Sequence, residues 1–197
     1  MTVYFIGGAS ASGKSTTAAQ LGLDYSIRII KLDDIYNVLV KAAGETEAKQ
    51  MIRPMSFACA NELMESNEPF IVEGGWISVE QAVLLHNGNS AAFRAVYCGY
   101  PNAKAADRFS QMADQQGSEE YKAHWTTDES KDYDAMIAWI TKQIAQSASY
   151  RKKSEASGFL FVDFTTFQDG ALALKIDFER WLASTCHSLP SRNDKSF

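Results

Sequence analysis

Only three cysteines occur in the chain, and no two of them are close in sequence. Cys59, Cys98 and Cys186 therefore form neither a zinc motif nor a disulfide framework, and they favour a reducing compartment, the cytoplasm. No apolar run approaches the roughly 20 residues that cross a membrane. Basic residues are also scarce, with 19 lysines and arginines against 24 aspartates and glutamates. The net charge of −5 argues against nucleic acid as a partner.

The chain does contain a short segment rich in glycine and serine near its start. From Gly8 to Thr16 it reads G-x-x-x-x-G-K-S-T, between an apolar run and a helix-compatible segment. Glycines let the backbone turn tightly against a phosphate, while amide groups and a helix dipole attract the negative charge. The spacing predicts a loop that binds a nucleoside triphosphate rather than a merely flexible turn. The residues expected to form this site are Gly8, Ser10, Ala11, Ser12, Gly13, Lys14, Ser15 and Thr16.

Two side chains of this loop are expected to contact the phosphates or the metal ion directly. Lys14 is expected to reach the β- and γ-phosphates and to act in catalysis. The hydroxyl of Ser15 is expected to ligate Mg²⁺.

Five strand-like runs alternate with helix-compatible segments along the rest of the chain. The predicted strands cover residues 3–6, 27–32, 70–73, 92–98 and 159–163, and the predicted helices cover 14–23, 35–43, 45–66, about 130–154 and about 170–183. Such alternation predicts an α/β fold with a five-stranded, mostly parallel sheet between layers of helices. We expect one domain over residues 1–184 and a frayed tail over 185–197.

The polar segment 101–129 interrupts this alternation after the fourth strand. It is expected to be a helical lid that closes over bound phosphates, with a surface insertion of no catalytic role as the alternative. Lys104 and Arg108 share one face of its first helix, and Arg108 is a candidate cation for the transferred phosphoryl group. Arg151, just before the last strand, is a further candidate for contacting the triphosphate.

Acidic residues follow the second strand. Ligands of parallel sheets bind beyond the carboxyl ends of the strands, so Asp33 and Asp34 stand where an acceptor has to bind. Asp33 is expected to orient an acceptor hydroxyl and take its proton. Asp34 is expected to cap a helix that starts near residue 35.

The third strand ends in Glu73-Gly74-Gly75-Trp76. Glu73 is a candidate for holding Mg²⁺ or a substrate hydroxyl, and Gly74 would allow close approach of the backbone. Trp76 is a candidate wall of the acceptor site, with core packing as the alternative. Arg53, on the helix after the paired aspartates, is a candidate for holding an anionic acceptor.

Taken together, Gly8–Thr16, Asp33-Asp34 and Glu73-Gly74 resemble the P-loop small-molecule kinases. That group includes shikimate and gluconate kinases, nucleoside monophosphate kinases and zeta-toxin-like kinases. The resemblance implies a central first strand, ATP with Mg²⁺ as donor, and a mobile lid. It also implies that Asp33 faces the acceptor and that Arg108 meets the γ-phosphate.

Two departures from that group bear on the acceptor. Shikimate kinases have an Asp-x-Asp arrangement where this chain has the adjacent residues Asp33 and Asp34, which does not support shikimate as acceptor. Adenylate kinases have an arginine in a Gly-Tyr/Phe-Pro-Arg element, where the similar string Gly99–Asn102 of this chain ends in asparagine. A metabolite hydroxyl is therefore favoured over a nucleoside monophosphate as acceptor.

Two other classes of protein remain as alternatives. A GTPase would explain the D-x-x-G match at Asp114–Gly117, but the chain has no N-K-x-D string to read guanine. A nucleotide-binding ATPase or a regulatory protein without a small-molecule acceptor is the stronger alternative.

Overall fold

The computed structural model describes residues 2–66, 68–114 and 133–186 of the chain. Its strands are β1 (Val3–Gly8), β2 (Arg28–Lys31), β3 (Phe70–Glu73), β4 (Phe93–Gly99) and β5 (Leu160–Asp163). Its helices are α1 (Lys14–Tyr25), α2 (Leu32–Ala43), α3 (Glu45–Met64), α4 (Val79–Gly88), α5 (Ala105–Asp114), α7 (Tyr133–Ala156) and α8 (Phe167–Cys186).

The five strands form one parallel sheet in the order β2-β3-β1-β4-β5. The first strand is therefore central, as predicted, and all six of its residues are buried. Lys31 of β2 is in register with Glu73 of β3, which is in register with Ile6 of β1. The segments that leave these three strands consequently emerge side by side at one edge of the sheet.

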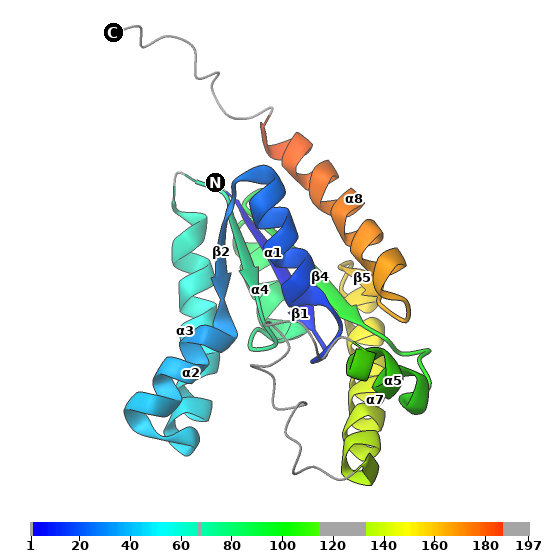
Figure 1. Cartoon of the computed structure of the whole chain (residues 1–197). Helices are drawn as coiled ribbons and strands as arrows, with labels where there is room; N and C mark the ends of the chain where they lie inside the picture. Colours follow the sequence, from blue (N-terminus) through cyan, green and yellow to red (C-terminus); the bar gives the residue numbers. More distant parts are fainter. Residues whose placement is uncertain (1, 67, 115–132, 187–197) are drawn as a thin grey trace, which may run out of the picture.

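Alternate residues of β1 face two separate cores. Val3 and Phe5 pack with residues of α3 and α4, whereas Tyr4 and Ile6 pack with residues of α1 and α8. Figure 1 shows α2 and α3 beside β2 at one side of the sheet and α8 at the other. Helices thus cover both faces of the sheet, and the predicted three-layer α/β/α fold is confirmed.

The structure differs from the sequence predictions at two helix starts. Helix α2 begins at Leu32, directly after β2, so its N-cap is Lys31 and the prediction that Asp34 caps it is wrong. Both Asp33 and Asp34 lie in the first turn, where their negative charges interact favourably with the helix dipole and stabilise the helix. Helix α4 was not predicted at all, because its ten residues are too few for a clear apolar period.

Two predicted segments lie partly outside the described residues. The first part of the predicted lid forms α5, and residues 115–129 of that prediction are not described. Helix α8 extends to Cys186, so the start of the predicted frayed tail is helical, and residues 187–197 are not described.

A capping box starts α4. The Ser78 hydroxyl accepts a hydrogen bond from the Gln81 amide at 3.2 Å, and the Gln81 side chain accepts one from the Ser78 amide at 3.0 Å. We predict that Ser78→Ala lowers the free energy of unfolding by about 0.5–2 kcal/mol, whereas Ser78→Asn, which keeps a capping oxygen, changes it by less. Urea denaturation measures both. Equal stability of the alanine variant and the wild type would contradict the prediction.

Candidate phosphate and acceptor site

The loop between β1 and α1 depends on glycine at two positions. Gly8 has a φ of +120°, and a Cβ there would collide with the backbone of Cys98 in β4. Gly13 has a φ of +93°, and its Cβ would lie 2.7 Å from the Phe167 ring. Residues with side chains rarely adopt such φ values, and here they would also meet packed neighbours. The glycines predicted from the motif are thus required by this backbone.

The first turn of α1 is suited to an anion. Its N-cap is Gly13, which makes no side-chain capping bond, and its first turn has no acidic residue. The first amide groups of a helix have no partner within the helix, and the dipole adds partial positive charge at the same place. The loop and helix start therefore fit a phosphate group.

Lys14 and Glu73 form a buried ion pair beside this loop. Their side chains are 7% and 2% exposed, and Lys14 Nζ lies 3.6 Å from Glu73 Oε1. Lys14 Nζ also donates to the carbonyl of Ala9 at 3.3 Å. The lysine of the motif thus lies folded against its own loop, with the carboxylate predicted from β3 beside it.

Burial raises the pKa of Glu73 above its ordinary value of 4.5; the Lys14 ammonium opposes this rise and the charge of Asp33 adds to it. A hydrogen bond from Ser15 also lowers the pKa. Within the described part of the chain, Glu73 Oε1 accepts no hydrogen bond although it is fully buried. A hard cation prefers such oxygen ligands, so Glu73 and the Ser15 hydroxyl fit Mg²⁺. Among the described residues, no group of three or more His, Cys, Asp or Glu side chains is placed to hold a metal ion, here or elsewhere.

Asp33 and Trp76 meet next to this pair. Trp76 Nε1 donates to Asp33 Oδ1 at 2.6 Å, and the Trp76 ring lies against Tyr36 with centroids 4.7 Å apart. Gly74, between Glu73 and Trp76, has a φ of +149°, and a Cβ there would lie 2.8 Å from Leu32. The structure thus brings together the acceptor residues predicted after β2 and β3.

Three side chains from distant parts of the chain form hydrogen bonds with the backbone of the phosphate loop. Tyr100 donates its hydroxyl to the Ser10 carbonyl at 3.0 Å, and the Ser10 amide donates to Gln143 Oε1 at 3.2 Å. Arg108 of α5 donates to the Ala11 carbonyl, and its guanidinium lies 4.5 Å from the centre of the Tyr100 ring. Arg108 therefore does reach the loop, at a backbone carbonyl.

Tyr100 and Gln143 were not predicted to contact the phosphate loop. Both are held in contact with the loop by long-range packing, since they are 90 and 133 residues from Ser10. Tyr100 lies in a small core with Ala9, Met112 and Ile140, where α5 and α7 pack beneath the loop. The only local signal was the helix predicted over about 130–154, and a predicted helix does not identify a polar contact.

Two further predicted cations lie on helices. Arg53, predicted to hold an anionic acceptor, is exposed on α3. Arg151, predicted to contact the triphosphate, pairs with Glu155 on α7 at 3.1 Å, and its guanidinium faces the Phe161 ring of β5 at 5.9 Å. Both roles stay predictions.

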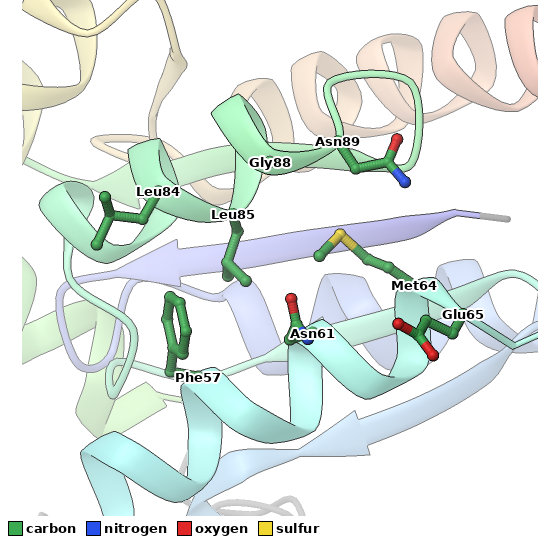
Figure 2. A pocket seen from close by; sticks show the side chains of 8 residues that line it. All are labelled: Phe57, Asn61, Met64, Glu65, Leu84, Leu85, Gly88 and Asn89. Carbon is green, nitrogen blue, oxygen red and sulfur yellow. The ribbon is translucent and has the colours of Figure 1, made fainter.

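A pocket between α3 and α4 is separate from this site (Figure 2). It lies near the ends of these helices that lead into β3 and β4, opposite the edge of the phosphate loop. Leu84 and Leu85 of α4 face Phe57 and Asn61 of α3 across it. None of the predicted site residues lines this pocket.

Among the described residues, none of the helices has the length and apolar character that a membrane span requires.

Comparison with known proteins identifies both a family and a fold. The family model described as an AAA domain matches residues 3–156. No curated protein matches the chain by sequence. Among solved structures, a shikimate kinase from Bacteroides thetaiotaomicron is similar with a TM-score of 0.55 and 15% identity, over 90% of this chain and 98% of that one.

Two further structures show the same fold. A gluconokinase from Sinorhizobium meliloti 1021 is similar with a TM-score of 0.53 and 13% identity, over 93% of this chain and 97% of that one. A shikimate kinase from Acinetobacter baumannii, solved in complex with shikimate, is similar with a TM-score of 0.51 and 15% identity, over 96% and 95%. At these identities the likeness establishes the shared fold alone.

The buried Glu73 gives the ligand-free protein a specific pH dependence. Folding raises the pKa of the Glu73 side chain. Its protonation therefore contributes to the free energy of unfolding at pH values below the pKa of the unfolded chain. This contribution is lost as the pH rises through the pKa of the folded protein. We predict that the wild type loses free energy of unfolding relative to Glu73→Gln as the pH rises above 4.5, the ordinary glutamate value. Urea denaturation across this range measures the difference, with the exposed Glu68→Gln as control. A difference that is constant with pH would contradict the assignment.

Proposed function

The chain belongs to the AAA domain family, and on that premise we propose that it is an ATP-dependent kinase of a small-molecule acceptor. The observation that supports this most directly is the position of Asp33 beside the phosphate loop. Strands β2, β3 and β1 are neighbours, and Lys31, Glu73 and Ile6 are in register near their carboxyl ends. Asp33 therefore stands next to Glu73, which is paired with Lys14.

Nucleotide binding is assigned to the loop from Gly8 to Thr16 and the start of α1. Bound ATP and Mg²⁺ supply the phosphoryl group and part of the positive charge that its transfer requires. Ser15 and Glu73 are the residues proposed to hold the metal ion, since both offer hard oxygen atoms at this edge. Lys14 is proposed to exchange its contact with the Ala9 carbonyl for the phosphate oxygens.

The acceptor is proposed to bind between Asp33 and Trp76. Phosphoryl transfer needs an acceptor hydroxyl that is oriented and can lose its proton. Asp33, exposed at the start of α2, is the carboxylate available to accept that proton. Buried Glu73 is engaged with Lys14, which favours Asp33 over Glu73 for the role.

A kinase is favoured over an ATPase that acts without an acceptor. An ATPase has to activate water next to the γ-phosphate, commonly with a second acidic residue after the third strand. In this chain Glu73 is followed by two glycines and Trp76. The aromatic pair of Trp76 and Tyr36 supplies a wall suited to an organic acceptor rather than to water.

The assignment is tested by measuring ATP consumption with and without pools of small hydroxylated metabolites. We expect turnover that requires one class of metabolite and falls about 10²–10³-fold in Lys14→Ala, because a preorganised cation at the phosphates is lost. Lys49→Ala, which removes an exposed lysine of α3, is the control. Turnover that no metabolite stimulates would favour the ATPase, and full activity of a folded Lys14→Ala protein would refute the phosphate site.

The paired aspartates allow a matched comparison. We predict that Asp33→Asn lowers kcat by about 10²–10⁴-fold with little change in ATP affinity, because the proton acceptor is lost while the shape is kept. Asp34→Asn, one residue further along the same helix turn, should keep turnover and lower stability by at most about 1 kcal/mol. Steady-state kinetics and thermal melts on both variants decide between them. Loss of turnover in Asp34→Asn alone would make Asp34, and not Asp33, the proton acceptor.

A further inference from the structure

Trp76 contacts Asp33 through its indole nitrogen rather than only packing beside it. The donor–acceptor distance of 2.6 Å is short for an N–H donor, as expected when the acceptor is a charged carboxylate. The indole reaches this position because β3 is followed by two glycines, of which Gly74 has a backbone conformation that side chains disfavour. The contact therefore depends on the way the chain leaves β3.

The indole is itself held in place from its other side. The Tyr36 ring, one turn along α2 from Asp33, lies 4.7 Å from the Trp76 ring at an interplanar angle of 33°. Leu32, the residue before Asp33, is fully buried against the same segment, close to Gly74. Asp33 is thus an exposed residue whose neighbours in the chain and in space are fixed.

A carboxylate in that setting needs a partner to keep one orientation. An exposed aspartate otherwise samples several side-chain rotamers, and only some of them direct an oxygen toward the phosphate loop. An indole N–H donates but never accepts. Its bond to Oδ1 consequently leaves the lone pairs of Oδ2 for the proton of an acceptor.

We propose that Trp76 is a positioning residue for Asp33, and that its N–H group fixes the carboxylate in the orientation that receives the acceptor proton. This role rests on the proposed kinase function. The acceptor proton moves to Asp33 Oδ2 as the hydroxyl oxygen forms its bond to the γ-phosphorus of ATP. The bond between that phosphorus and the oxygen bridging to the β-phosphate breaks in the same step, and ADP leaves with that oxygen, while the indole proton stays on Trp76. Tyr36 supports the indole by packing its tilted ring against it and takes no part in proton transfer.

The hydrogen bond itself is tested without any acceptor. Protein labelled with ¹⁵N at the tryptophan indoles gives one N–H signal per tryptophan, and Trp76→Phe identifies the signal of Trp76. We expect this signal to move strongly upfield in Asp33→Ala, because the carboxylate acceptor is lost, and to stay in place in Asp34→Ala. An unmoved signal in Asp33→Ala would show that the bond does not form in solution and would overturn the proposal.

The role in catalysis is tested by removing the N–H group alone. Benzothienylalanine introduced at position 76 keeps the bicyclic ring and has sulfur in place of N–H, and Trp76→Phe is the simpler variant. With the metabolite pool that supports turnover, we expect both to lower kcat by about ten- to a hundredfold, since small misplacements of a catalytic group cost up to about 10²-fold. The KM for ATP should not change. Trp181→Phe, in the core between α8 and β1, is the matched control.

The outcomes separate the two claims. An unchanged kcat in the benzothienylalanine variant of an active kinase would overturn the positioning role and leave the kinase assignment intact. If the wild type showed no turnover with any metabolite, the kinase assignment and the role that rests on it would both fall, while the indole signal would still report whether the bond exists. A raised KM for ATP with kcat unchanged would place Trp76 in nucleotide binding instead and would also overturn the proposal.

Discussion

The close approach of Gly8 to the backbone of β4 is the constraint on which the site depends. Strand β1 pairs with β4 over its whole length and with β3 from Val3 to Ile6, and at its last residue, Gly8, a side chain would collide with Cys98. The chain therefore leaves the sheet at a glycine and turns back into α1 without capping side chains. This places the start of a helix at the centre of the sheet edge, where residues after β2 and β3 can reach it.

The charged side chains at the carboxyl edge of the sheet lie in two different environments, one buried and one exposed. Lys14 and Glu73 are buried together, so each compensates a charge that would be costly alone. Asp33 is exposed and is oriented by an indole N–H instead. The buried pair suits binding of phosphate and metal, and the exposed carboxylate suits an acceptor that enters from solvent. The outer side of the loop is held separately by side chains of α5 and α7.

Local patterns were sufficient to predict the sheet and the loop, but not the contacts between distant elements. The glycine spacing identified the phosphate loop because each glycine has a backbone reason to be there. Helix α4 was missed although Ser78 and Gln81 form a capping box that could have indicated it. The cap assigned to Asp34 was wrong because β2 passes directly into α2 at Leu32. Gln143 of α7 contacts Ser10 across 133 residues, a contact that depends on how helices pack and not on any local period.

The central claim is that one crevice holds both the phosphate loop and the proton acceptor of a transfer reaction. A crystal structure with Mg²⁺ and a non-hydrolysable ATP analogue tests it most directly. The account predicts a γ-phosphate contacted by Lys14, a metal ion held by Ser15, and the carboxylate of Asp33 facing the γ-phosphate across a gap that fits one hydroxyl group. A nucleotide whose γ-phosphate points away from Asp33, or that binds outside the loop from Gly8 to Thr16, would contradict it.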